Sequence, residues 1–408
     1  MIKTEFANRA ARRPLRLGID VPLLLIVITL MIFGLLMLYS ASWDYSYLQY
    51  GSPTYLFNRQ LIWLGLGVGV AILSTLITYR VWRPLALPLM IVTIGGLLYV
   101  LIRSEVLLGA VRTVAGGSIQ PSEMAKIMTV IYLAVWLDSK RALLNDITFG
   151  LIPLAAILGV IGGLIYSQPD LSATATVLIL GGVLFFLAGA DIRQILLMLL
   201  IAVVLGWVVV QLKLSNSARV ISYIPGLQDP TQAHPHIQRS YEAFISGGWI
   251  GVGIGKATTK LTGLPFPPTD SIFAVVGEET GVLGSALLVT LYGLMLWRGL
   301  VIARKAPDQL GALLSAGLSI WIVLEAFLNM AGMLGLIPLA GNALPFVSYG
   351  GSNLMVTLTA VGIQLNIARI SAKMDDQEEQ PYRAFVDLRR RNRRRRVSRL
   401  GRAADPEE

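Results

Sequence analysis

The sequence predicts an all-α polytopic membrane protein with about ten transmembrane helices. Of its 408 residues, 55% are hydrophobic and only 14% are charged. The mean hydropathy is +0.67, which is far from the average usage of a soluble globular domain. Apolar runs of about 20 residues, the length that crosses a bilayer, recur along most of the chain. Together these observations exclude a soluble enzyme or a soluble binding module.

The expected spans follow one another through short connections, except for one long loop between the seventh and the eighth. They cover 21–40, 60–78, 83–102, 120–138, 149–167, 173–190, 192–212, 270–299, 308–335 and 351–370. The first run exceeds the apolar core of a signal peptide, about 7–15 residues, so we expect an uncleaved span. The region 173–212 can also be divided differently, which leaves the count of ten open.

One membrane domain is expected over 20–372, between two basic tails. The N-terminal tail comprises residues 1–19, and the polar C-terminal tail, 373–408, has a composition typical of disorder. The tail segment RRRNRRRRVSR at 389–399 follows a span closely, so we attribute it to attraction by anionic membrane lipids rather than to nucleic acid. The remaining large segment, 213–269, is expected to be a loop on the outer side.

The distribution of positive charge predicts the topology. If the N-terminus is cytoplasmic, most of the 34 Lys and Arg residues fall in the tails and in the cytoplasmic loops. This asymmetry fits the positive-inside rule and an even number of spans. We therefore expect both termini in the cytoplasm and the loop 213–269 outside.

Polar residues gather at the outer ends of four spans, where a charge escapes the full cost of burial in hydrocarbon. The clusters are IQPSEMAKI with Gln120, Glu123 and Lys126; SQPDLSATA with Asp170; LPFPPTDSIF with Thr269 and Asp270; and GNALPFVSYGG with Ser348. Arg112 lies in the connection that precedes the first cluster. Cations and carboxylates on one side of the membrane suit a lipid-linked pyrophosphate and a sugar hydroxyl that needs a base. The residues alone thus indicate an enzyme or a transporter for anionic lipid-linked substrates.

Each charged residue in these clusters also has a structural alternative. Glu123 and Lys126 are three positions apart on one helix face, so they can form an internal ion pair, or Glu123 can orient Lys126 toward an anionic ligand. Asp170 and Asp270 can each be a helix N-cap or a site residue. Glu278 and Glu279 lie about 12 Å deeper along the same helix than Asp270, so we expect them to serve helix packing or to line a cavity.

Two features do not indicate ligand sites. GVGIGK at 251–256 lacks the first Gly and the final Ser or Thr of a phosphate-binding loop, so close packing or a tight turn explains its glycines better. His234 and His236 have no third ligand at metal-site spacing, and no protein metal site is expected. The chain has no cysteine, which excludes disulfides and thiol chemistry.

Five sequence motifs, in this order, carry a family resemblance. They are IQPSEMAKI (119–127), SQPDLSATA (167–175), ISGGWIGVGIG (245–255), TDSIFAVVGEETGVLG (269–284) and GLIPLAGNALPFVSYGGSN (335–353). At these residues the chain resembles the SEDS family of cell-wall proteins, which includes FtsW, RodA and SpoVE. The resemblance extends over about 21–372.

The resemblance implies a peptidoglycan glycosyltransferase in the bacterial cell (plasma) membrane. Such an enzyme polymerises lipid II during cell elongation or division and works beside a class B penicillin-binding protein; the alternative is a lipid II flippase. By position, Asp270 matches the essential aspartate of the family. The substrate-binding positions that follow from the resemblance are Arg112, Gln120, Glu123, Lys126, Asp170, Thr269 and Ser348. A divalent cation, Mg²⁺ or Mn²⁺, is implied by the family alone.

Two departures from the family motifs affect the site. The segment around Arg112 is shorter than usual and lacks a tryptophan that commonly follows the arginine. FPPTD at 266–270 replaces a family sequence that carries a Glu and a His before the aspartate. The substrate contacts at these positions are therefore expected to differ from those of typical members.

Overall fold

The computed structural model describes residues 18–103, 120–168, 170–198, 200–201, 222–339 and 341–374. Within these ranges the chain is helical and contains no strand. The helices are α2 (Val21–Tyr50), α3 (Tyr55–Leu76), α4 (Trp82–Arg103), α5 (Pro121–Ser139), α6 (Ile152–Tyr166), α7 (Leu171–Leu187), α10 (Tyr223–Gln228), α11 (Pro235–Gly247), α12 (Ile272–Arg304), α13 (Gln309–Met333) and the C-terminal helix Gly351–Met374, with short turns η1 (Tyr79–Val81), η2 (Arg141–Leu143), η3 (Ile147–Leu151) and η4 (Pro230–Gln232).

Seven of the described helical segments are long and apolar enough to cross a membrane, and α7 is a shorter apolar helix. Outside 192–212, each expected span coincides with a helix. The span expected at 192–212 lies largely outside the described residues. The all-α membrane fold is therefore confirmed, whereas the total of ten spans stays a prediction.

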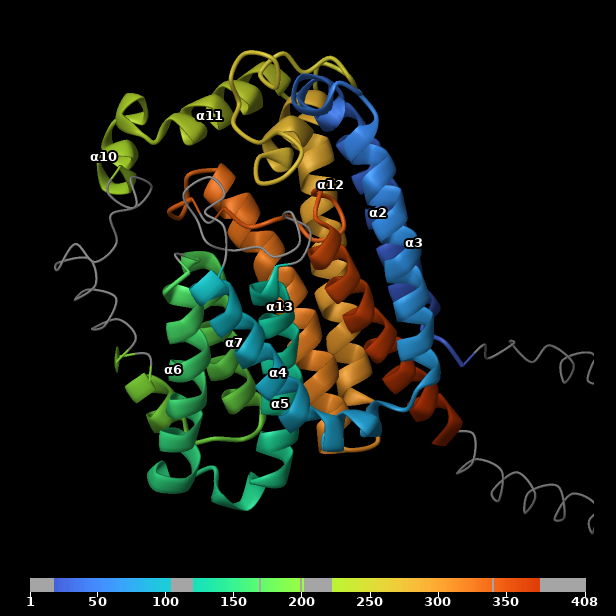
Figure 1. Ribbon diagram of the computed structural model, residues 1–408, viewed down its shortest axis with the longest axis vertical. Helices are drawn as coiled ribbons and strands as arrows, with labels where there is room; N and C mark the ends of the chain where they lie inside the picture. Colours follow the sequence, from blue (N-terminus) through green and yellow to red (C-terminus); the bar gives the residue numbers. More distant parts are fainter. Residues whose placement is uncertain are drawn as a thin grey trace, which may run out of the picture.

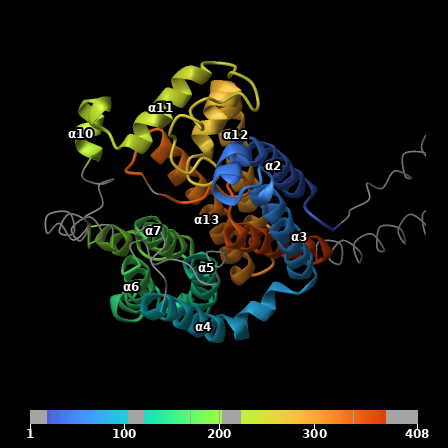
Figure 2. The same cartoon turned by 45° about the horizontal axis from the view of Figure 1, so that its top comes forward.

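The long helices form a bundle with α13 and the C-terminal helix at its centre (Figures 1 and 2). In the most apolar stretch of α13, 78% of the residues are buried, against 33% in α2 and 17% in α3. Helix α13 packs against α12, α5 and α7, while α2 and α3 cover the side formed by α12 and the C-terminal helix. The peripheral helices accordingly keep many exposed Leu, Ile and Val side chains, as lipid-facing helices do.

One ion pair joins α2 and α12 at the same end of the bundle. Asp20 is the N-cap of α2, where its Oδ1 accepts from the backbone N–H of Leu23 at 3.0 Å. The same carboxylate receives two hydrogen bonds from Arg298 near the end of α12, at 2.8 and 2.7 Å. The pair brings the beginning of α2 and the end of α12 to the same level of the molecule.

Helix α12 is interrupted at Gly281, where φ is +69° and ψ is −168°. Only glycine adopts this backbone region readily. The break frees carbonyls and N–H groups, and the segment after α11 satisfies them. Its Val252 and Gly253 donate to the carbonyls of Glu278 and Glu279, and the N–H groups of Val282 and Leu283 donate to Gly248 and Trp249. Gly251 thus serves close packing against α12, whereas Gly253 and Gly255 adopt the positive φ of turns, as the sequence interpretation of these glycines expects.

Candidate active site

Asp270 lies in the turn that precedes α12, and three other parts of the chain contact this turn. Asn329 of α13 donates from Nδ2 to the Asp270 carbonyl at 2.9 Å. Ser348 donates from Oγ to the carbonyl of Thr269 at 2.7 Å. His236 of α11 contacts the hydroxyl of Ser271 through its Nε2. These contacts position the Asp270 turn through its backbone and through the neighbouring residues.

The helix-cap alternative for Asp270 loses support from this geometry. The N-cap of α12 is Ser271 and not Asp270, and the Ser271 side chain makes no capping hydrogen bond. Asp270 itself is half-buried in the turn formed by FPPTD. A half-buried carboxylate just before a membrane helix is placed to contact both protein and a lipid-borne substrate.

The segment 341–350 braces this turn and explains the position of Ser348. The Ser348 hydroxyl accepts from the N–H of Leu344 at 2.8 Å while it donates to Thr269. The N–H of Tyr349 donates to the carbonyl of Pro268 at 2.7 Å. Burial raises the pKa of the Tyr349 phenol above its usual value, so the side chain stays neutral at physiological pH. Ser348 is 4% exposed, and its hydroxyl holds the Asp270 turn from within the protein.

A buried charge cluster joins α5, α13 and the C-terminal helix. Lys126 pairs with Glu123 at 2.8 Å and also with Glu325 of α13. Asn353 donates to both carboxylates, at 2.9 Å to Glu123 and 3.5 Å to Glu325. Lys126 is 2% exposed. Lys126 thus has two carboxylate partners within the protein, and its positive charge balances these buried negative charges.

Gln120 and Asp170 form a second polar group beside the charge cluster. Asp170 caps α7 by accepting from the N–H of Ala173 at 3.2 Å, as the capping alternative predicts. Gln120 donates from Nε2 to the other carboxylate oxygen at 3.3 Å, and its N–H donates to Ser352 at 3.2 Å. This contact fixes the start of α5 against the C-terminal helix.

Two asparagines connect the Asp270 turn to the charge cluster. Asn329 donates to the carbonyl of Asn342 at 2.6 Å as well as to Asp270. Asn342 donates to the carbonyl of Glu325 at 2.8 Å. The sequence interpretation missed Glu325, Asn329, Asn342 and Asn353. A usable signal existed, because Glu325 and Asn329 are four positions apart in an otherwise apolar run and therefore share one helix face.

Glu278 and Glu279 attach the loop to α12, as expected of packing residues. Glu278 accepts from the N–H groups of Thr258 and Thr259, at 2.8 and 3.3 Å. Glu279 accepts from Ser40 of α2 at 2.5 Å and pairs with Lys260 at 2.9 Å. Both carboxylates are buried, and neither belongs to the group around Asp270.

The remaining sequence predictions concern Arg112 and a divalent cation. Arg112 lies outside the described residues. Within those residues no three His, Cys, Asp or Glu side chains come together as a metal site, and the paired carboxylates of Glu123 and Glu325 are occupied by Lys126. This part of the chain therefore offers no ready donor set for the cation that the resemblance implies.

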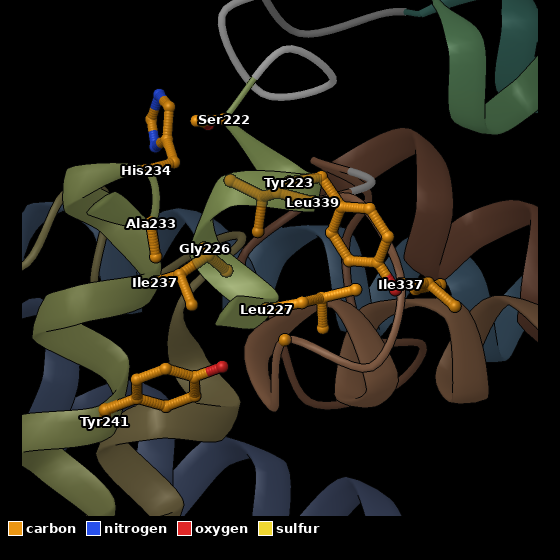
Figure 3. A pocket seen from close by; sticks show the side chains of 11 residues that line it. Ser222, Tyr223, Gly226, Leu227, Ala233, His234, Ile237, Tyr241, Ile337 and Leu339 are labelled. Carbon is orange, nitrogen blue, oxygen red and sulfur yellow. The ribbon is translucent and has the colours of Figure 1, made fainter. Parts of the chain in front are cut away.

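A small pocket lies apart from Asp270, between α10, α11 and the segment after α13 (Figure 3). Its empty volume is about 320 Å³, including space open to solvent. Tyr223 and Tyr241 flank it from two elements, and the Tyr223 hydroxyl donates to the carbonyl of Leu336 at 2.6 Å. This bond links α10 to the segment after α13, and none of the predicted site residues lines the pocket.

Comparisons with known proteins agree with this architecture. The family model FtsW/RodA/SpoVE, described as a cell cycle protein, matches residues 21–373. A probable peptidoglycan glycosyltransferase FtsW of Trichlorobacter lovleyi is 36% identical over 362 residues, which cover 88% of this chain and 95% of that protein. Stage V sporulation protein E of Bacillus subtilis is 35% identical over 359 residues, which cover 86% of this chain and 97% of that protein.

Solved structures extend the similarity to the fold. A structure of a peptidoglycan synthase complex, concerned with the coordination of polymerization and crosslinking, contains a chain that matches with a TM-score of 0.73 and 28% identity, covering 86% of this chain and 98% of that one. The crystal structure of the rod shape determining protein RodA of Thermus thermophilus matches with a TM-score of 0.64 and 27% identity, covering 87% and 98%. With the family model matched over nearly all of the membrane domain, the chain belongs to the FtsW/RodA/SpoVE family, the SEDS proteins.

Proposed function

We propose that this chain is a peptidoglycan glycosyltransferase that polymerises lipid II at the outer face of the bacterial plasma membrane. The observation that carries the proposal is the Asp270 turn. Contacts from α13, the segment 341–350 and α11 hold this turn in place, with the half-buried Asp270 just before α12. The similarity to FtsW proteins named as probable peptidoglycan glycosyltransferases supports the reaction class.

In the proposed reaction, Asp270 is the general base. The acceptor sugar hydroxyl attacks the anomeric carbon of the donor, and its proton passes to the Asp270 carboxylate. The new glycosidic C–O bond forms as the bond between the anomeric carbon and the pyrophosphate oxygen breaks. The undecaprenyl pyrophosphate leaves with the bonding electron pair, and the anomeric configuration inverts.

The departing pyrophosphate needs positive charge close by. Arg112 is the proposed cation, on the basis of its position in the sequence. Lys126 contributes differently, because its two carboxylate partners hold it within the protein. We assign to the Lys126 cluster the task of fixing α5, α13 and the C-terminal helix around the substrate. No step is assigned to a metal ion.

The rival function is transport of the same lipid. A transporter places its essential polar groups near the bilayer midplane on broken helices. Here the break in α12 at Gly281 is 17 positions from Arg298, about 26 Å along the helix, close to the far edge of a hydrocarbon layer of about 30 Å. Asn329, which donates to the Asp270 carbonyl, is 21 positions from Asp308 at the other end of α13, about 32 Å along that helix. The geometry therefore favours a polymerase.

Polymerisation in detergent distinguishes the two functions. Purified full-length protein, together with a class B penicillin-binding protein as the proposed partner, is incubated with lipid II in micelles. Because a micelle has no second leaflet, a flippase has no work to do there, whereas a polymerase forms glycan chains. Products are resolved by gel electrophoresis. Absence of polymer from the wild-type protein with its partner, under conditions where a known polymerase acts, would contradict the proposal.

A further inference from the structure

Large apolar side chains are exposed on the segment Ile245–Ile254, which joins the end of α11 to the following loop. Ile245 is 80% exposed, Trp249 74% and Ile250 79%. Val252 and Ile254 are also exposed, and no charged residue occurs between 243 and 255. A run of exposed large apolar side chains without a charged neighbour in the sequence is unfavourable in water and indicates contact with another apolar phase.

Two helices independently place this segment at the edge of the hydrocarbon layer. The ion pair of Asp20 and Arg298 marks one end of the bundle. On α2, Ser40 is 20 positions from Asp20, and on α12, Glu279 is 19 positions from Arg298. Each interval spans about 30 Å of helix, the thickness of the hydrocarbon core. Ser40 and Glu279 meet in a hydrogen bond, so both helices reach the far edge of the layer at the same level.

The surface of α2 marks the same level. Tyr39, Trp43 and Tyr47 are exposed there, at 42%, 42% and 61%. Exposed Trp and Tyr side chains are typical of the interface between headgroups and acyl chains. Figure 1 shows the segment after α11 next to the upper ends of α12 and α2. Trp249 therefore continues a belt of interfacial aromatic residues.

The backbone polar groups of the segment are hydrogen-bonded within the protein and do not depend on water. Non-helical backbone at the edge of hydrocarbon must find its hydrogen bonds within the protein. The Gly251 N–H donates to Gly247, and the N–H groups of Val252 and Gly253 donate to α12. The carbonyls of Gly248 and Trp249 accept from α12 in return. A loop that faces water would not need this degree of internal pairing.

We propose that Ile245–Ile254 is an interfacial membrane anchor, whose apolar side chains insert between the lipid headgroups and the first carbons of the acyl chains. The exposed apolar face of α12, with Val282, Leu283 and Leu287, continues its surface into the bilayer. Lys256 is exposed directly after the anchor, where its ammonium group reaches the lipid phosphates.

The anchor controls the depth of the Asp270 turn. Gly281 divides α12, and the anchor is hydrogen-bonded on both sides of that division. The short part of α12 before Gly281 begins two residues after Asp270. By holding this part at a fixed height, the anchor keeps Asp270 level with headgroups, where a lipid-borne pyrophosphate lies.

Site-directed spin labelling measures the insertion directly and does not depend on enzymatic activity. The chain has no cysteine, so single cysteines are introduced at Ile250, at Leu287 as the lipid-facing control and at Gln232 as the aqueous control. Gln232 is exposed in η4, and the following Ala233 lines the small pocket together with Gly335, which follows the end of α13. The labelled proteins are reconstituted in nanodiscs, and collision with oxygen is compared with collision with a water-soluble nickel complex.

We expect the ratio of oxygen to nickel collisions at position 250 to be severalfold higher than at 232 and to approach that at 287. A ratio at 250 equal to that at 232 overturns the anchor. Protection of position 250 from both reagents overturns it as well, because the segment would then be covered by protein rather than by lipid.

A second experiment tests the control of depth, and this part rests on the proposed function. Ile250→Asp is compared with Ile250→Leu for polymerisation of lipid II in nanodiscs and in detergent micelles. We expect the Asp variant to lose most activity in the bilayer but to retain it in micelles, where no depth is imposed, and the Leu variant to be active in both. Equal loss in both media would indicate a packing defect and contradict the control of depth. Inactive wild-type protein would instead contradict the proposed function and leave the labelling result valid.

Discussion

At the scale of single residues, Asp270→Asn separates chemistry from structure. Asparagine keeps the shape of the side chain but cannot accept a proton at neutral pH. Asn329 and Ser348 hold the turn through the carbonyls of Asp270 and Thr269, which the substitution leaves in place, so we expect the variant to fold normally. Polymerisation should fall by about 10²–10⁴-fold, the range of a missing general base. The measurement is the initial rate of glycan synthesis by purified protein, with thermal unfolding as the control, and near-normal synthesis would remove Asp270 from the mechanism.

A second residue-scale prediction concerns the charge cluster. Lys126→Met leaves Glu123 and Glu325 buried without a cation, and loss of one member of a buried ion pair typically costs about 3–5 kcal/mol. The triple variant Glu123→Gln/Lys126→Met/Glu325→Gln carries no charge in the cluster. We expect a much lower unfolding temperature for the single variant. In the triple variant, both the unfolding temperature and the rate of polymerisation should return toward the wild-type values. A triple variant that is stable but inactive would contradict the purely structural role and would indicate that Lys126 stabilises the pyrophosphate.

At the scale of elements, the break in α12 gives a test of backbone strain. In Gly281→Ala, the new Cβ would lie 2.5 Å from the N of Gly251 and 2.6 Å from the carbonyl of Trp249. The positive φ adds a strain of about 1–3 kcal/mol. We expect a lower unfolding temperature and faster proteolysis of the loop after α11.

Gly293→Ala is the matched control on the same helix. Nothing lies within 4 Å of its Cβ position, and alanine favours a helix by about 0.5–1 kcal/mol over glycine. This variant should be as stable as the wild-type protein or more so. Equal stability of the two variants would show that the contact between the break and the loop contributes little.

At the scale of the whole molecule, the topology can be tested by labelling. Both termini are predicted to be cytoplasmic and the loop 213–269 external. In intact cells, a cysteine that replaces Gln228 should react with a membrane-impermeant reagent, because α10 belongs to that loop. A cysteine that replaces Pro307, between α12 and α13, should be protected until the cells are opened. The reverse pattern would overturn the orientation.

The sequence by itself determined the membrane class and the helical spans. Hydrophobic runs of bilayer length leave the backbone one inexpensive solution, the helix, because no water is available to satisfy its polar groups. The motifs around Asp270 and Glu123 were recognisable for a related reason, since a charged residue next to an apolar span is costly and rarely accidental. The N-cap role of Asp170 was likewise visible from local spacing.

Only the tertiary structure decided which groups meet. Lys126 has one acidic neighbour on its own helix face, but its second partner, Glu325, is 199 positions away. The link from Asp270 through Asn329 and Asn342 likewise joins distant segments. Local patterns define which face of a helix is polar but not which other helix that face contacts. The packing of α13 in the centre of the bundle settled these contacts, because buried polar groups in an apolar core must find partners wherever the fold supplies them.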